Sequence, residues 1–162
     1  MSVGYRLKLI TNRYAPLLIR VILGGIFIYA GAGKILYPAN FAEAIANYQL
    51  IPFPGTNLVA IILPWVEFIS GLCLLNGLKT QSSNFIIFLC LCVFTFGVVT
   101  ALARGLDINC GCFSEAGRRV GFVFLAEEAG LLAMSVYIFF FDNGFFSLDR
   151  LIQNYRSALF TP

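Results

Sequence analysis

Two cysteines, Cys110 and Cys112, are separated by a single glycine in the polar stretch "LDINCGCFSEAGRRVG" at residues 106–121. In extended backbone the Cα atoms of residues i and i+2 lie about 6.6–6.8 Å apart, at the top of the disulfide range. Gly111 can supply the tighter turn that a bond needs, because glycine readily adopts positive φ. The ring is small and strained, and strained disulfides are easily reduced. Cys110 and Cys112 are therefore the predicted catalytic pair, suited to thiol–disulfide exchange.

Charged neighbours of this pair could tune its chemistry, and two other interpretations stay open. Asp107 could serve as a base, and nearby arginines could stabilise a thiolate. The two thiols could also merely pack, or could bind a metal with donors from another protein. The chain has no histidine and no C-x-x-C spacing, so we expect no zinc or iron–sulfur site from this chain alone. The arginines near the cysteine pair are Arg104, Arg118 and Arg119.

Ionisable side chains inside apolar runs are the second group with possible chemistry. Glu67 stands near the middle of the run "LVAIILPWVEFISGLCLLNGL", two residues after Trp65. An ionisable group at that depth is costly and by default a functional candidate. Electrons from a thiol pair need an acceptor, and the chain lacks haem and metal ligands. Glu67 and Trp65 are therefore expected to form a quinone headgroup site or a proton path, unless such charges only tie helices together.

Further charges are expected near the membrane face that carries the cysteine pair. Glu127 and Glu128 stand about two turns into the last apolar run, and Lys34 and Arg104 should end at the same face. An ion pair between one of these glutamates and one of these cations is expected beneath the cysteine loop. Arg20, nearer the other face, is expected to extend its charged end to water.

The composition predicts the elements that position these groups. Hydrophobic residues make up 59% of the 162 residues and charged residues 12%, against about 45–50% and about 25% in soluble chains. Four runs reach the roughly 20 apolar residues that a span needs. They must be helices, because lipid offers the backbone no partners and no barrel-type alternation is present. We expect an all-α integral membrane four-helix bundle, with spans at 15–36, 58–78, 84–103 and 122–141.

This plan divides the chain into three parts. Residues 1–14 form an N-terminal segment, residues 15–141 the four-helix domain with its cysteine loop at 104–121, and residues 142–162 an amphipathic interfacial tail. The first run exceeds the usual signal-peptide core of about 7–15 residues, so cleavage there is not expected. Residues at helical spacing predict a short interfacial helix after the first span, ended by Pro52 and Pro54. These residues are Phe41, Ala44, Ile45 and Tyr48.

Small residues and the remaining cysteines are expected to serve packing. Small surfaces let membrane helices approach closely, within a compact bundle or against another membrane protein. They are Gly24, Gly25, Gly31 and Gly33 on the first span and Ala126, Gly130 and Ala133 on the fourth. Cys73, Cys90 and Cys92 fall within predicted helices, where small apolar packing is the expected role.

Basic residues predict the orientation. Four spans place both termini and the second loop on one side, with six lysines and arginines; the other side has three, all in the cysteine loop. The positive-inside rule then places both termini in the cytoplasm and the Cys-Gly-Cys loop outside. In a bacterial inner membrane the loop would face the oxidising periplasm, where disulfides form and exchange. The six basic residues on the side of the termini are Arg6, Lys8, Arg13, Lys79, Arg150 and Arg156.

Three stretches of the sequence resemble a known family. "GGIFIYAGAGKILYPANFAEAIANYQLIP" and "PWVEFISGLCLLNGL" look like the first two spans of DoxX-like proteins. "ARGLDINCGCFSEAGRRVGF" is similar to the loop of the MauE branch, named for methylamine utilisation. The resemblance covers about residues 15–140 and implies a four-helix membrane protein associated with redox work. MauE-type members are linked to maturing a periplasmic dehydrogenase with a disulfide-rich small subunit, and DoxX and DoxD relatives to thiosulfate:quinone oxidoreduction.

The carry-over from this family rests on Cys110, Cys112 and Glu67. Relatives often have an arginine and a polar residue where this chain has Glu127 and Glu128, so any partner contact made by that arginine is not carried over.

Two functions follow from the sequence. The first is a membrane thiol–disulfide redox protein whose pair exchanges with a periplasmic thioredoxin-like or redox protein. It would pass electrons towards quinone or support disulfide formation and maturation, with no cofactor of its own. The second is a non-catalytic accessory subunit of a larger respiratory or photosynthetic electron-transfer complex, favoured by the small size and the lack of a second dithiol. A small-solute permease is a weaker third, and nothing indicates nucleic-acid binding.

Overall fold

The computed structural model describes residues 14–48, 53–105 and 122–142, and within these ranges the chain forms five helices and no strands. The helices are α2 (Ala15–Leu36), α3 (Pro38–Asn47), α4 (Phe53–Asn76), α5 (Thr80–Ala103) and α6 (Phe122–Phe141). All but α3 contain a stretch long and apolar enough to cross a membrane. The predicted all-α architecture with four spans is confirmed, and the protein is a multi-pass membrane protein. Spans one and four have their predicted bounds, whereas α4 begins five residues and α5 four residues earlier than predicted.

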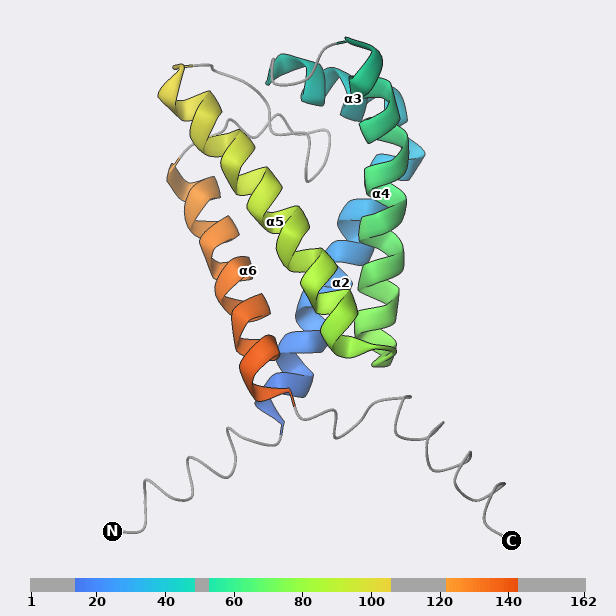
Figure 1. The fold of residues 1–162 in the computed structure, drawn as a ribbon, viewed down its shortest axis with the longest axis vertical. Coiled ribbons are helices and arrows are strands. Elements are labelled where there is room, and N and C mark those ends of the chain that lie inside the picture. The colour runs from blue at the N-terminus through green and yellow to red at the C-terminus, as the bar shows by residue number, and fades with distance from the viewer. Residues whose placement is uncertain (1–13, 49–52, 106–121, 143–162) are drawn as a thin grey trace, which may run out of the picture.

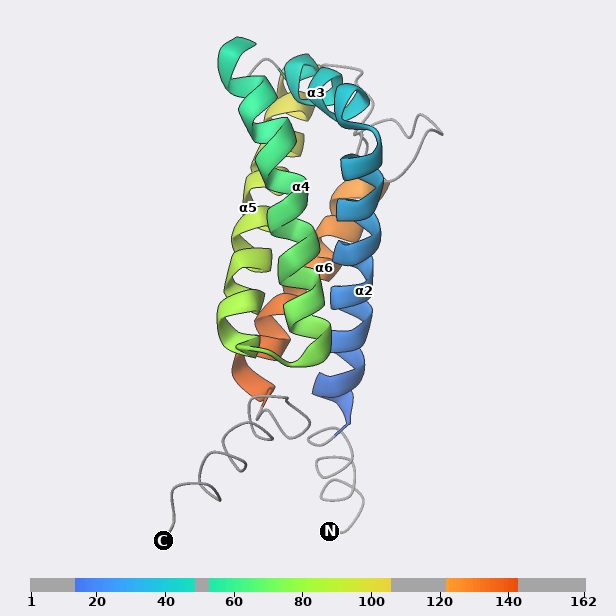
Figure 2. The same cartoon turned by 90° about the vertical axis from the view of Figure 1, so that its right-hand side faces the viewer.

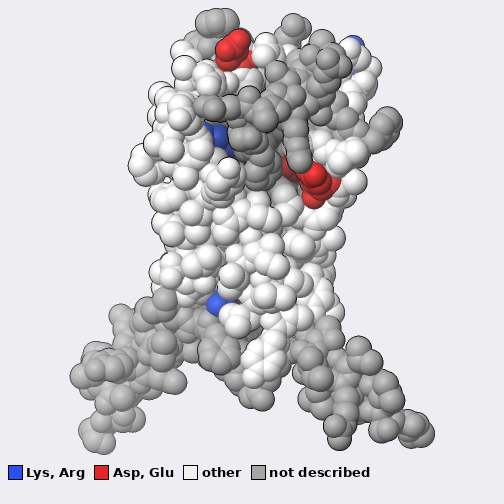
Figure 3. All heavy atoms as spheres, turned by 180° about the vertical axis from the view of Figure 1, so that it is seen from behind, with Lys and Arg blue, Asp and Glu red and all other residues white. Residues whose placement is uncertain are grey.

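The four long helices form an up-and-down bundle in which α2 contacts α4, α4 contacts α5, α5 contacts α6, and α6 returns to α2 (Figure 1). The short helix α3 lies across the end where α2 finishes and α4 begins (Figure 2). The first turn of α2 and the last turn of α6 lie together at the opposite end (Figure 1). Seen from behind, uncharged surface separates the charges near one end from those near the other, as lipid contact requires (Figure 3).

Helix α3 confirms the short helix predicted after the first span. It buries Phe41 and Ala44 and half-buries Ile45 and Tyr48, which is the predicted apolar stripe. It ends at Asn47, and Pro54 is the second residue of α4. Helix α3 ends before both prolines, as predicted; Pro52 lies outside the described residues, and Pro54 stands in the first turn of the next helix, α4. Proline is tolerated in the first turn, because its missing N–H has no intrahelical acceptor there.

Helices α2 and α4 approach so closely that glycine is required at their contact. A Cβ on Gly31 would lie 2.9 Å from the carbonyl oxygen of Pro64, and one on Gly24 would lie 3.0 Å from that of Gly71. These positions confirm the predicted small surface on the first span. Gly25 and Gly33 have nothing within 4 Å of such an added atom, so they play no part in this contact. On α6, the small residues Ala126, Gly130 and Ala133 are exposed and do not pack within the bundle.

Adding one methyl group at this contact should destabilise the bundle. We expect Gly31→Ala to cost about 1–3 kcal/mol, because the clashing atoms are backbone atoms of α4 and the helices must separate. Gly33→Ala is the matched control on the same helix and should be neutral or slightly stabilising, because alanine favours helix over glycine. Reversible unfolding in mixed micelles measures both changes. Equal effects of the two substitutions would contradict the close α2–α4 contact.

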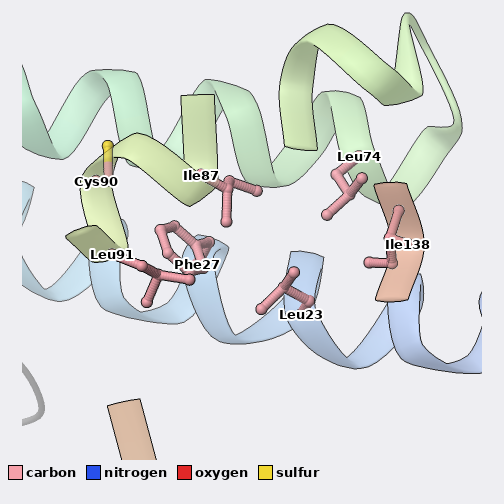
Figure 4. Close-up of a cluster of buried hydrophobic side chains, with 7 residues drawn as sticks. All are labelled: Leu23, Phe27, Leu74, Ile87, Cys90, Leu91 and Ile138. Carbon is pink, nitrogen blue, oxygen red and sulfur yellow. The ribbon is translucent and has the colours of Figure 1, made fainter. Parts of the chain in front are cut away.

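The apolar core is built from the four long helices. Its seven buried residues are Leu23, Phe27, Leu74, Ile87, Cys90, Leu91 and Ile138 (Figure 4). Cys90 thus has the packing role that the sequence predicted, while Cys73 and Cys92 are half-buried and all three are free thiols. This core lies between the two charged regions of the bundle interior described below.

Short connections and a polar link fix how the helices pair. The turn after α4 places Gly77 at φ 70°, and the Leu78 N–H bonds to the Cys73 carbonyl oxygen at 2.8 Å. This is a Schellman end, which needs a left-handed residue that glycine supplies best.

Between α5 and α6, the Asn84 amide donates to the Ser135 carbonyl oxygen at 2.8 Å, and the Ser135 hydroxyl donates to the Asn84 side-chain oxygen at 3.0 Å.

Candidate functional site

A buried ion pair joins the first two spans. The ammonium of Lys34, on α2, donates to both carboxylate oxygens of Glu67, on α4, at 2.9 and 2.8 Å. Lys34 is only 5% exposed and Glu67 1%. Hydrogen bonds between ionised groups are the stronger kind, and removing one partner of a buried pair leaves an uncompensated charge. The pair therefore fixes two helices and concentrates charge inside an apolar bundle.

The antiparallel register of α2 and α4 brings these two residues together. Gly24 faces Gly71 and Gly31 faces Pro64 and Phe68, so Lys34 lies close to the level of Glu67. Side chains on a helix lean towards its N-terminus. Because α2 and α4 run in opposite directions, the long side chain of Lys34 leans towards Glu67 and that of Glu67 leans towards Lys34.

Two aromatic rings enclose the ammonium of Lys34. Its Nζ lies 4.9 Å from the ring centroid of Phe41 on α3 and 4.4 Å from that of Phe94 on α5. The face of an aromatic ring attracts a cation, and more strongly where water is excluded. This contact gives α3 a function in the fold: it supplies one wall around the charge.

A second buried carboxylate, Glu128 on α6, completes the group. Glu128 is 4% exposed, and its Oε2 has no hydrogen-bond partner. It lines, with Lys34 and Glu67, a cavity of about 20 Å³ whose other walls are apolar. That space holds about one water molecule. We call Lys34, Glu67 and Glu128 the charge cluster.

The structure separates Trp65 from Glu67. Trp65 is 51% exposed on the outer side of α4, whereas Glu67 points into the bundle. Residues two apart on a helix lie about 200° apart around its axis, so they face different surroundings. The two residues that the sequence grouped in one quinone or proton site therefore do not share the cavity.

The position of Trp65 gives a direct check on the membrane-facing surface. It is the single tryptophan of the chain, so its fluorescence reports one site. In vesicles containing lipids with brominated acyl chains, its emission should be strongly quenched, and a water-soluble quencher such as iodide should have little effect. Strong quenching by iodide with none by brominated lipid would place Trp65 outside the hydrocarbon region and contradict α4 as a span.

The expected Glu–Lys pair is present, but the partner of Lys34 is Glu67 and not Glu127 or Glu128. Lys34 bonds to Glu67, as described above, while Glu127 and Arg104 are exposed. The contact between Asn84 and Ser135 sets the α5–α6 register. Asn84 and Ser135 lie at the same level of the bundle. With a rise of 1.5 Å per residue from there, Arg104 lies about 20 Å further along the bundle than Glu128 does. Arg104 therefore lies beyond reach of the charge cluster.

Arg20 also differs from expectation. It is 3% exposed and lies inside the bundle, where its guanidinium is 3.7 Å from the Asp142 carboxylate. The prediction that its side chain reaches water was wrong, because Asp142 follows directly after α6 and supplies a counter-charge. This second ion pair ties the first and last spans at the end opposite the charge cluster.

The predicted catalytic pair, Cys110 and Cys112, lies outside the described residues. The nearest described residues on either side are Gly105, after α5, and Phe122, at the start of α6. Both lie at the end of the bundle where α2 finishes, which is also the end nearer the charge cluster (Figure 1). Glu128 lies about 9 Å along α6 from Phe122, at 1.5 Å per residue.

Several contributors to the site were not found from the sequence. Phe41 and Phe94 are two of many phenylalanines, and no spacing rule assigns them to Lys34. Thr95, on α5, is a polar neighbour of Glu128. Asn84 and Ser135 carried a usable signal, since each is a polar residue within or beside an apolar run.

The cavity beside Glu67 does not fit a quinone ring. Sites for organic ligands occupy about 300–1,000 Å³, and this cavity offers about 20 Å³. Within the described residues, no group of three or more metal-binding side chains is present either. The cluster is therefore suited to protons and water rather than to a bound organic group.

Known proteins are similar in sequence to most of this chain. The family model described as methylamine utilisation protein MauE matches residues 12–141. Protein TlpB of Flavobacterium psychrophilum is 28% identical over 81% of this chain and 38% of TlpB. MauE of Paracoccus versutus is 26% identical over 73% of this chain and 64% of that protein, and MauE of Methylophilus methylotrophus 25% over 77% and 65%.

The chain spans less than two thirds of the length of these relatives, and no solved structure matches it. The family match includes all four spans and the segment with Cys110 and Cys112. On this match, the protein belongs to the MauE family.

Proposed function

We propose that this protein is a membrane thiol–disulfide redox protein that supports disulfide formation in, or maturation of, a periplasmic redox protein. Cys110 and Cys112 are the exchanging pair. The observation that carries the proposal is the buried charge cluster, at the end of the bundle nearer the residues that flank the cysteine segment. Costly buried charges at this end of the bundle favour a role beyond helix packing.

The proposed exchange moves two electrons without a cofactor. A partner thiolate attacks one sulfur of the Cys110–Cys112 disulfide, that S–S bond breaks, and a mixed disulfide forms. The second partner thiolate then attacks the partner sulfur of the mixed disulfide and releases the reduced pair. The partner is oxidised to a disulfide, and Cys110 and Cys112 receive two electrons and two protons. A second periplasmic disulfide returns the pair to its oxidised form by the reverse steps.

The cavity of the charge cluster is too small for a quinone. Quinone therefore remains a proposed final electron acceptor only at another site. We infer no step through a quinone from the described residues. The lipid-facing surface around Trp65 is open to such a molecule, and a quinone-reduction assay with Trp65→Leu tests that assignment. An unchanged rate would remove it.

The orientation is part of the proposal. The excess of lysine and arginine on the side of the termini and second loop supports a cytoplasmic placement of that side in a bacterial inner membrane. The cysteine pair then faces the periplasm, where exchange partners are kept oxidised or reduced by dedicated systems.

Trapping of the mixed disulfide tests the function. In cells that express Cys112→Ser or Cys110→Ser, one of the two variants should accumulate a covalent adduct with a periplasmic protein that disappears on reduction. The double variant Cys110→Ser/Cys112→Ser is the control and should give none. The wild-type protein should be alkylated at these positions only after reduction. Free alkylation of both thiols in oxidising conditions, with no adduct in either variant, would sink the proposal.

A non-catalytic accessory subunit is the second candidate, favoured by one feature of α6. Its outer side exposes the small residues Ala126, Ala129, Gly130 and Ala133 within a membrane span. Such a face lets another helix approach closely. Purification from native membranes in mild detergent separates the two candidates. A stable stoichiometric complex that forms equally well with the double cysteine variant supports the accessory function, whereas a lone protein trapped through one cysteine supports the redox function.

A further inference from the structure

Glu128 differs from the other members of the charge cluster in its hydrogen bonding. Both oxygens of Glu67 accept hydrogen bonds from Lys34, whereas Oε2 of Glu128 is buried and has no partner. An ionised carboxylate in such a place is disfavoured, because burial removes its hydration and Oε2 gains no hydrogen bond in exchange.

The balance of charge points to the same conclusion. Lys34 supplies one positive charge, which the carboxylate of Glu67 balances. If Glu128 were also ionised, the cluster would carry a net negative charge inside an apolar bundle. The other titratable or polar groups around the cluster bring no cation; they are Cys90 and Thr95 on α5 and Glu127 on α6. A proton on Glu128 removes the excess charge and turns its carboxyl into a hydrogen-bond donor.

The cavity gives this proton a path. Lys34, Glu67 and Glu128 all line it, and its volume of about 20 Å³ suits one water molecule. An ammonium has three N–H donors, and the contacts to the two oxygens of Glu67 use at most two of them. A water in the cavity can accept a remaining N–H and contact the carboxyl group of Glu128, which gives it two of the two to four polar partners that a buried water needs.

We propose that Glu128 is a membrane-buried proton-binding site, which holds a proton in the resting protein and exchanges it through water in the adjoining cavity. Lys34 and Glu67 are the fixed counter-charges that position it. The step is proton exchange alone: the carboxyl releases a proton to water and regains one from water. The site goes beyond the proposed thiol exchange and does not depend on the cysteines.

Infrared spectroscopy of the full-length protein in lipid vesicles at neutral pH tests this site. The wild-type spectrum should contain the C=O stretch of a protonated carboxylic acid, and transfer to D2O should shift that band. Glu128→Gln should remove it. Glu127→Gln, one residue away and exposed, is the matched control and should keep it. Glu128→Asp keeps the acid in a changed setting and should move the band, which identifies the residue even if the glutamine variant fails to fold.

Three outcomes overturn the proposal. A wild-type spectrum without a protonated acid band means that Glu128 is ionised. A band that survives in Glu128→Gln, or stays in place in Glu128→Asp, belongs to another carboxyl. A band that D2O does not shift shows that the proton does not exchange with water.

Discussion

Replacing Lys34 by methionine is expected to destabilise the protein by about 3–5 kcal/mol, the usual cost of removing one partner from a buried ion pair. Methionine preserves the length and apolar stem of the side chain, so the loss reports the charge. Without the ammonium, Glu67 is left at 1% exposure with no cation among its described contacts. Reversible unfolding in mixed micelles measures the change in the free energy of unfolding.

A double-mutant cycle separates the ion pair from general packing damage. Glu67→Gln should cost less than Lys34→Met, because Glu128 lies near enough to Lys34 to replace the lost carboxylate. The double variant Lys34→Met/Glu67→Gln should be more stable than the sum of the single losses predicts, since it buries no unpaired charge. Arg104→Met, at the exposed end of α5, serves as a control and should change stability little. Additive losses in the cycle would show that the two side chains do not act as a pair.

The sequence predicted the four spans well but not their register. Runs of about 20 apolar residues are enough to place membrane helices, because every other backbone arrangement leaves unpaired polar groups in lipid. The start of α4 was missed because Pro54 and Gly55 suggest a helix break, although a first turn tolerates both residues. The partner of Lys34 was missed for a deeper reason. That partner depends on how far α4 slides along α2, and backbone contacts at Gly24 and Gly31 set this distance.

Residue type identified which ionisable side chains cost free energy in lipid, but not which partner stabilises each of them. Glu67 and Glu128 were both singled out as membrane charges, yet one is paired and the other has an unpartnered oxygen. Arg20 was expected at the surface, because a lone arginine near a span end usually reaches water. Its burial depends on Asp142, which is far away in sequence and stands just outside the last span.

Substitution of both loop cysteines should have the largest effect on function. In cells carrying Cys110→Ser/Cys112→Ser, oxidation of the periplasmic partner is expected to fall to background, because a serine hydroxyl cannot form or exchange a disulfide. An alkylation-shift assay on the partner measures the fraction of its thiols that remain reduced. The matched control is Cys73→Ser/Cys92→Ser, which removes two free, half-buried thiols from the spans and should leave oxidation at the wild-type level.

The same variants also decide between the two proposed functions. If the protein is an accessory subunit, the loop variant keeps both the larger complex and its electron-transfer activity. If it is a redox protein, the loop variant folds and inserts normally but the partner stays reduced. The charge-cluster variants should behave differently again, because Lys34→Met acts on the stability of the bundle and not on the sulfur atoms. If only the Cys110 and Cys112 variants lose partner oxidation, and they keep the wild-type free energy of unfolding, the chemistry belongs to the loop. The charge cluster then supports the fold of the bundle.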